Sequence, residues 1–155
     1  STAMYKSFVK NTFQDINKVI FQKTGLAFFY GLLFTSAVQS STVTTSLVVP
    51  LVASKKVTLS KAFPFIIGAN IGTTITAVIA SIYKPEAAIA LALVHVLFNS
   101  LGALIFLPFS SIRQIPVWIA NYMGKISLKY RIVVFAYILL TFFVIPFLLI
   151  YFTTD

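Results

Sequence analysis

The sequence predicts an all-α integral membrane protein on the basis of three observations. Of its 155 residues, 59% are hydrophobic and 10% are charged, whereas about 25% of the residues in a soluble domain are charged. The mean hydropathy is +0.96. Three stretches without a formal charge have about the 20 residues that a helix needs to cross a bilayer core. The twelve lysines and arginines lie between apolar stretches, so they indicate membrane topology and not a nucleic-acid partner.

Two segments are expected to lie in the membrane interface. Residues 1–24 place apolar side chains at roughly helical spacing, with lysines mostly on other faces, which is typical of an interfacial amphipathic helix. Residues 108–131 combine four basic residues with Trp118 and Tyr122, which suit a cytoplasmic interfacial segment with an aromatic anchor.

The three expected spans are residues 62–83, 87–107 and 132–152. The last is the most apolar, and Pro146 within it predicts a kink that neighbouring helices can accommodate.

Residues 25–53 are expected to form a re-entrant helical hairpin. As one helix these residues would rise about 43 Å, well beyond a hydrocarbon core of about 30 Å. The polar run QSSTVTTS, residues 39–46, would then lie in the middle. Two arms, residues 25–38 and 42–53, would rise about 21 Å and about 18 Å, so neither crosses alone. The sequence therefore predicts a hairpin with QSST near its tip, close to the membrane midplane.

The distribution of basic residues supports that topology. If the hairpin enters and leaves on one side, eleven of the twelve lysines and arginines share that side and Lys84 alone lies opposite. The eleven are Lys6, Lys10, Lys18, Lys23, Lys55, Lys56, Lys61, Arg113, Lys125, Lys129 and Arg131. If residues 25–53 crossed fully, the split would be seven against five. The positive-inside rule therefore favours the hairpin, with a cytoplasmic N-terminus and an extracytoplasmic C-terminus.

The polar run at the expected tip has the chemistry of an ion site. A buried hydroxyl or amide without a partner costs on the order of 2 to 7 kcal/mol, so these groups require partners. Ser40, Ser41 and Thr42 are good capping residues for the second arm, whose first N–H groups have no intrahelical acceptor. The positive end of this half-helix attracts an anion, and side-chain and carbonyl oxygens suit a hard cation such as sodium.

A second polar interruption lies within the first expected span, where residues 68–76 read GANIGTTIT. Gly68 and Gly72 weaken a helix, so we expect a broken span. Its side-chain oxygens come from Asn70, Thr73, Thr74 and Thr76. Broken helices that meet a re-entrant element at the midplane are typical of secondary transporters. Neither polar segment contains a lysine or arginine, so an anion held there would depend on helix dipoles, hydroxyls and bound cations.

Packing roles are the alternative interpretation of several of these residues. The Gly-x-x-x-Gly pattern at Gly68 and Gly72 is frequent at helix contacts, and a single Ser or Thr commonly bonds back to its own helix. His95 and Asn99 are four residues apart and share a helix face. They are expected to give polar support as a satisfied pair facing the bundle, with a proton relay as the alternative.

These motifs resemble a known family. The runs TSAVQSSTVTTSLVVPLV, KAFPFIIGANIGTTITAVIAS and ALVHVLFNSLGALIFLPF are similar to the repeat unit of type II sodium-phosphate cotransporters. That family carries a QSSS motif, a G-[AS]-N-I-G-T-T segment and an H-x-x-x-N span in this order. Here Thr42 replaces the third Ser of QSSS, and Ala69 precedes Asn70 where some members carry Ser. The ending of the chain resembles the region after the second of two inverted repeats, so a C-terminal half is expected.

The resemblance implies sodium-coupled uptake of inorganic phosphate by alternating access, with sites between two inverted repeats and co-transported sodium ions as the only cofactors. By match to the motifs, the phosphate-binding residues would be Gln39, Ser40, Ser41 and Thr42. The sodium-binding residues would be Gln39, Ser40, Asn70, Thr73, Thr74 and Thr76.

A site between two repeats needs a second half, and no second QSS-like run occurs in the chain. Either the chain is part of a longer protein or two copies assemble as a homodimer through the faces that carry both motifs. The expected partners are therefore phosphate, sodium, the lipid bilayer, and the other repeat half or a second copy, with no nucleic acid.

Two other classes of function compete with transport. A channel module is one, because TTIT superficially resembles a cation filter, and a membrane scaffold with packing motifs only is the other. An enzyme is not expected, because the spans contain no acid-base pair or nucleophile constellation. The expected location is the bacterial inner membrane.

Overall fold

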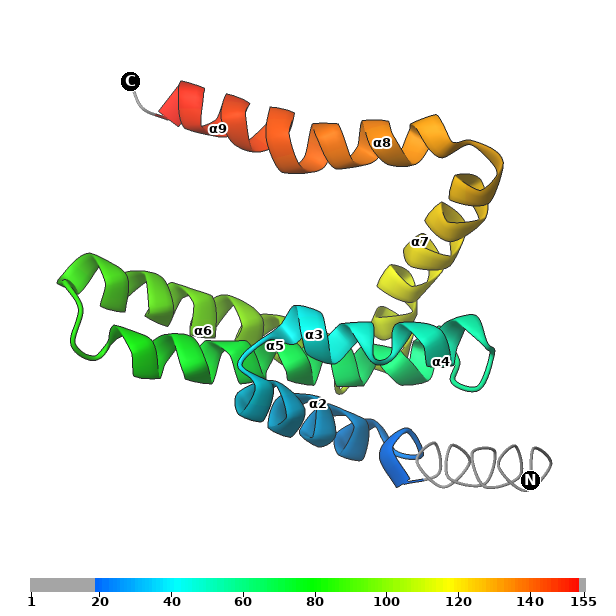
Figure 1. Cartoon of the computed structure of the whole chain (residues 1–155), viewed down its shortest axis with the longest axis horizontal. Helices are drawn as coiled ribbons and strands as arrows, with labels where there is room; N and C mark the ends of the chain where they lie inside the picture. Colours follow the sequence, from blue (N-terminus) through cyan, green and yellow to red (C-terminus); the bar gives the residue numbers. More distant parts are fainter. Residues whose placement is uncertain (1–18, 154–155) are drawn as a thin grey trace, which may run out of the picture. The chain divides into compact units, whose positions relative to one another are not determined.

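The computed structural model describes residues 19–153, and the regular elements in that range are all helical. The chain divides between Gln114 and Ile115 into two compact units. The first contains α2 (Thr24–Val38), α3 (Ser41–Ser46), α4 (Val49–Ala53), α5 (Leu59–Ser81), α6 (Glu86–Phe106) and the start of α7 (Ser110–Lys129) (Figure 1). The second contains the rest of α7, α8 (Arg131–Leu139), the π-helical turn η1 (Leu140–Val144) and α9 (Ile145–Thr153). The interfacial helix expected over residues 1–24 lies almost entirely outside the described residues.

The predicted all-α class is confirmed for the described residues, and three candidate spans correspond to the three predicted ones. Three helical stretches are long and apolar enough to cross a membrane: Leu59–Ser81, Glu86–Phe106 and Arg131–Thr153. Two shorter apolar helical stretches, Thr24–Val38 and Ser41–Ala53, correspond to the two expected hairpin arms. The arms meet at Gln39 and Ser40, where the chain reverses direction (Figure 1).

The second arm is interrupted, which the sequence analysis did not anticipate. Helix α3 ends at Ser46, and α4 begins at Val49 with Pro50 in its first turn. Proline has no N–H to give to the carbonyl of Ser46, and its ring collides with that carbonyl in a continuous helix. The break between α3 and α4 therefore follows from Pro50.

Helices α2 and α5 pack at very close range through small residues. The buried residues of α2 are Ala27, Gly31 and Thr35, spaced four apart on one face. A Cβ atom on Gly31 would collide with the carbonyl oxygen of Phe65, and one on Gly68 would collide with that of Phe28. The packing interpretation of Gly68 is therefore the one that the structure supports.

The expected break in the first span is wrong, because α5 is one continuous helix from Leu59 to Ser81. The threonine hydroxyls of α5 donate hydrogen bonds to backbone carbonyls of the same helix. Thr73 donates to the carbonyl of Ala69 at 3.1 Å, and Thr74 donates to that of Ile71 at 2.7 Å. The glycines place backbone against backbone instead of unwinding it. Polar residues here are therefore compatible with an intact span.

The two arms and α5 share an apolar core at one end of the first unit. Phe21, Ala27, Val48, Val57, Ala62 and Phe65 form this cluster. The rings of Phe21 and Phe34 lie 5.6 Å and 6.4 Å from that of Phe65. The hairpin is thus anchored on the first half of α5.

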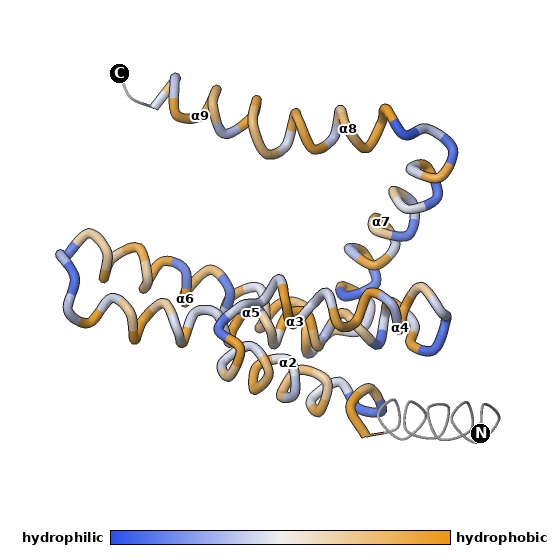
Figure 2. Tube along the Cα trace, viewed as in Figure 1, coloured by the Kyte–Doolittle hydropathy of each residue, from blue (hydrophilic) through white to orange (hydrophobic). Residues whose placement is uncertain are grey.

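Among the described residues of the first unit, the basic residues other than Lys84 lie at the end where α2 and α5 begin and α4 ends (Figure 1). Arg113 Nη1 donates to Thr24 Oγ1 at 3.0 Å, and Gln114 Nε2 donates to Ser60 Oγ at 2.9 Å, so α7 starts at this end too. Lys84 lies in the turn between α5 and α6 at the other end. Figure 2 shows hydrophilic residues in the α4–α5 and α5–α6 turns and mainly hydrophobic residues along the helices between them.

The second unit contains the third candidate span. The expected disturbance at Pro146 takes the form of η1, in which Ile145 donates its N–H to the carbonyl of Leu140. A π-helical turn just before a proline accommodates the lost hydrogen bond and the ring. In α7, the rings of Trp118 and Tyr122 stack 5.5 Å apart on an exposed face, as an interfacial aromatic pair would.

Candidate functional site

The turn between α2 and α3 is held by two residues of the QSST motif. Gln39 ends α2 in the left-handed region, with φ 59° and ψ 22°, and donates its N–H to the carbonyl of Thr35 at 2.6 Å. Glycine is the usual residue for this conformation, and other residues adopt it at a cost of about 1 to 2 kcal/mol. A glutamine in this conformation is uncommon, and Lys55 is the other described non-glycine residue with a positive φ.

Ser40 begins α3 as its N-cap. Its backbone is extended, and its Oγ accepts the N–H of Val43 at 3.3 Å. Its carbonyl accepts the Thr44 hydroxyl at 3.0 Å. The amides of Ser41 and Thr42, in the first turn, have no intrahelical acceptor. The capping role expected for Ser40 is therefore confirmed.

The hydroxyls of the polar run fall into two groups. Thr44, Thr45 and Ser46 each donate to a carbonyl three or four residues earlier, so their bonding capacity is used within the turn and helix. Within the described part of the chain, the side chains of Gln39, Ser41 and Thr42 take part in no hydrogen bond, and they are exposed or half-buried. Of the four residues predicted to bind phosphate, Gln39, Ser41 and Thr42 thus have side chains without an internal partner, whereas Ser40 uses its Oγ as the helix cap.

The predicted sodium-binding residues of α5 lie on more than one face. Thr73 and Thr76 follow the stripe of Ala62 and Ala69, and Ala62 adjoins the second arm. Asn70 instead lies toward α6, where it lines a cavity of about 490 Å³ together with Asn99. Thr74 is 2% exposed. Helix α3 packs on α5, but among the described residues no hydrogen bond joins residues 39–42 to these α5 side chains.

The two residues predicted to give polar support share the face of α6 turned to α5, but they do not form a pair. Asn99 donates from Nδ2 to the carbonyl oxygen of Asn70 at 3.4 Å. His95 lines a separate hollow nearer the α5–α6 turn, beside Ala77 and Ser81. Of these two residues, Asn99 is therefore the one that contacts a predicted sodium-binding residue, Asn70.

Two buried hydroxyls that the sequence analysis did not select adjoin the turn. Thr35 is 0% exposed, and neither its Oγ1 nor the Oγ of Ser36 has a hydrogen-bond partner. A buried hydroxyl left unpaired costs on the order of 1 to 3 kcal/mol. The sequence pattern that could have identified Thr35 is the spacing of the small residues Ala27, Gly31 and Thr35, which places Thr35 on the face of α2 that packs against α5.

Loss of the cap should weaken the turn. Ser40→Ala is expected to destabilise the start of α3 by about 1 kcal/mol, because the N–H of Val43 loses its acceptor. Hydrogen exchange at the Val43 amide should then become about fivefold faster. Thr58→Ala is the matched control, because Thr58 begins α5 without a capping hydrogen bond. Unchanged exchange at Val43 in the Ser40 variant would show that the cap carries no stability.

Together, the fold and site define a helical membrane protein in which a polar helical turn packs beside a spanning helix. A family model described as Na+/Pi-cotransporter matches residues 1–141. The chain belongs to this family, which confirms the resemblance found in the motifs.

Curated relatives agree with this assignment. The chain is 38% identical over 125 residues to human sodium-dependent phosphate transport protein 2B, covering 78% of this chain and 18% of the relative. It is 38% identical over 125 residues to human protein 2C, covering 78% and 21%. The match to sheep protein 2A is 37% over 124 residues, covering 77% and 19%. The chain thus spans about a fifth of the length of these relatives, and no solved structure matched it.

Proposed function

We propose that this chain contributes one half of the site of a sodium-coupled phosphate transporter. The relatives are named for sodium-dependent phosphate transport, and the family description names sodium and phosphate. The observation that carries the proposal is the set of unused side-chain donors at the α2–α3 turn, namely those of Gln39, Ser41 and Thr42. Together with the free amides of the first turn of α3, they offer several neutral donors to one oxyanion.

Neutral donors suit an anion that must also leave the site. No lysine or arginine occurs in residues 24–54 or 62–83, so phosphate would not be held by a fixed side-chain cation near the turn. Its charge would be balanced by co-bound sodium instead. This arrangement makes phosphate affinity dependent on sodium, as coupling requires.

Sodium is assigned to hydroxyl and carbonyl oxygens of the turn and of α5. A threonine that donates its proton back to the helix keeps its oxygen lone pairs for a cation. Thr73, Thr74 and Thr76 have this arrangement in the intact helix, so they do not need an unwound backbone to bind sodium. We add Thr35 and Ser36 as candidates, because their buried oxygens have no other partner.

We also propose that the hairpin is re-entrant. Its arms are shorter than the three candidate spans, and its two ends lie at one end of the first unit (Figure 1). That end carries Lys23, Lys55, Lys56, Lys61 and Arg113, against Lys84 at the other. The positive-inside rule then assigns the basic end and the N-terminus to the cytoplasm. The relatives are mammalian, so they support a membrane location but not the expected bacterial inner membrane.

The complementary half of the site would come from an inverted repeat, supplied by other parts of a longer protein or by a second copy of this chain. Either partner would cover the exposed side of the turn and surround the bound ions.

Phosphate uptake into proteoliposomes tests the proposal. The chain is reconstituted alone and together with a complementary repeat, with an inward sodium gradient or a potassium gradient as control. We expect saturable uptake that requires sodium, at least when the complementary repeat is present. Uptake by the chain alone would identify a homomeric assembly, which light scattering corrected for detergent should then show as a dimer.

The same experiment separates the competing functions. A channel module would pass ions down either gradient without coupling, and a scaffold would give no flux. Sodium-independent flux, or no flux in either preparation, would contradict the proposed symport.

A further inference from the structure

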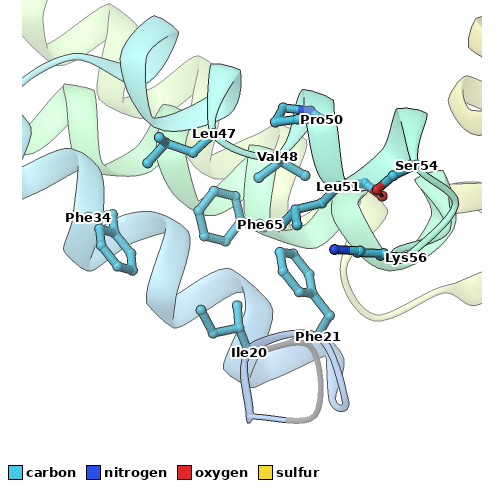
Figure 3. Close-up of a pocket in the computed structure, with 10 residues that line it drawn as sticks. All are labelled: Ile20, Phe21, Phe34, Leu47, Val48, Pro50, Leu51, Ser54, Lys56 and Phe65. Atoms are coloured by element: carbon cyan, nitrogen blue, oxygen red, sulfur yellow. Dashed lines mark hydrogen bonds between the residues drawn. The ribbon is translucent and has the colours of Figure 1, made fainter. Parts of the chain in front are cut away.

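An apolar groove runs beside the hairpin, from the basic end of the first unit toward the QSST turn. It has a volume of about 420 Å³ and is formed by residues before α2, by the second arm and by α5 (Figure 3). Its lining residues are Ile20, Phe21, Phe34, Leu47, Val48, Pro50, Leu51, Ser54, Lys56 and Phe65. Eight of these ten are apolar, so the body of the groove suits a hydrocarbon ligand.

The polar atoms of the groove gather at one end. Figure 3 shows Ser54 and Lys56 side by side beyond Leu51, with the amine of Lys56 directed toward Phe21. The Ser54 hydroxyl donates to the carbonyl of Leu51 at 3.2 Å, so Lys56 is the group that gives the mouth its charge. The groove therefore has an apolar body and a cationic mouth. This polarity matches a molecule with a hydrocarbon chain and an anionic head.

The turn after α4 places Lys56 at this mouth, and its neighbour Lys55 carries a conformational cost. Lys55 has φ 58°, in the left-handed region where glycine is the usual residue. The amides of Lys56 and Val57 both donate to the carbonyl of Leu51, at 3.0 and 3.2 Å. Because that carbonyl at the end of α4 is capped by the backbone, its negative charge is reduced near the mouth.

The dimensions fit one leaflet of a bilayer. From Leu47 to Ser54 the arm rises about 10 Å, and half of a hydrocarbon core measures about 15 Å. The groove would thus extend from the interface, where Lys56 lies, into a single leaflet. An acyl chain of one lipid fits this depth.

Charge distinguishes a lipid from a protein occupant. The mouth belongs to the end that carries Lys23, Lys55, Lys56 and Lys61, and Glu86, the acidic residue of the described part of this unit, lies at the other end. A second copy that presented its own lysine-rich end to this groove would be repelled, because the two ends carry charge of the same sign. Anionic lipid headgroups are attracted by basic clusters on the cytoplasmic side of membrane helices.

We propose that this groove binds an anionic glycerophospholipid. One acyl chain lies along Phe21, Leu51 and Phe65, and the headgroup phosphate lies at Lys56, since the Ser54 hydroxyl already donates to the carbonyl of Leu51 at 3.2 Å. The proposal is independent of the phosphate-transport assignment, because the groove contains none of the residues proposed to bind phosphate or sodium.

Native mass spectrometry of the full chain in detergent tests the inference, with dioleoyl phosphatidylglycerol and dioleoyl phosphatidylcholine as probes. We expect phosphatidylglycerol to bind more tightly than phosphatidylcholine. Lys56→Gln should weaken phosphatidylglycerol binding about fivefold. Leu47→Trp should weaken it similarly by filling the groove, and Leu47 is exposed enough to change without disturbing the core. Lys84→Gln is the control at the opposite end and should leave binding unchanged.

Three outcomes would overturn the proposal. Equal binding of the two lipids would show that no headgroup is recognised. Equal losses in the Lys56 and Lys84 variants would show only a general effect of net charge. Dissociation of a dimer by Leu47→Trp, without loss of lipid, would show that the groove is covered by a second copy.

Discussion

Gly68→Ala is expected to lower the free energy of unfolding by about 3 kcal/mol, the upper part of the range for over-packed cores. An added methyl group would collide with the carbonyl oxygen of Phe28, which is backbone and cannot rotate away. Helices α2 and α5 would have to separate. The contacts that Phe65 and Ala69 of α5 make with Gly31 of α2 would then be lost. Unfolding in a titration with sodium dodecyl sulfate, followed by circular dichroism, measures the change.

Gly102→Ala is the matched control for this experiment. Gly102 also lies inside a candidate span, but nothing is within 4 Å of the added methyl group. This change should be neutral or stabilising, by up to about 1 kcal/mol, because alanine favours a helix more than glycine does. Equal effects of the two substitutions would show that the close contact between α2 and α5 does not determine stability.

Gln39→Gly is expected to reduce sodium-dependent phosphate uptake at least tenfold while leaving the fold intact. Glycine adopts the left-handed conformation of residue 39 without strain, so the turn should be as stable as before or more so. What the substitution removes is the side-chain amide at the proposed site. Uptake into proteoliposomes, containing the complementary repeat where that is required, measures the loss, and circular dichroism checks the helix content.

Gln39→Asn separates the effect of the backbone conformation at residue 39 from the effect of its side-chain amide. Asparagine tolerates the left-handed conformation and keeps a shorter amide, so intermediate uptake is expected. Full uptake in the glycine variant would exclude the Gln39 side chain from substrate binding and would transfer the proposed role to Ser41 and Thr42.

The position of the turn was predictable because it depends on length and local chemistry. A stretch of 29 residues is too long for one span, and a polar run in its middle favours a reversal of the backbone at that place. The turn forms at Gln39 and Ser40, inside the predicted QSST tip. Hydropathy likewise predicted the three candidate spans, because crossing a bilayer requires about 20 apolar residues whatever lies beside them.

The state of residues 68–76 was not predictable from composition. Glycines and threonines in a span are compatible with a broken helix or with a close helix contact, and the neighbour decides between them. Here the glycines of α5 pack directly against the backbone of α2, as Gly68 does against the carbonyl of Phe28. The helix α5 stays continuous. The break in the second arm at Pro50 was, by contrast, a local effect that the sequence contained.

The sequence by itself determined the all-helical membrane class, the spans, the polar turn and the residue types available to ions. These depend on the solvent preference of each segment and on hydrogen bonds between near neighbours in the chain. Only the tertiary structure decided that the hydroxyl oxygens of Thr35 and Ser36 are buried without partners, that Asn99 reaches Asn70, and that an apolar groove ends at Lys56. Each of these depends on which helix faces are brought together, because burial and pairing are properties of contacts between segments far apart in the chain.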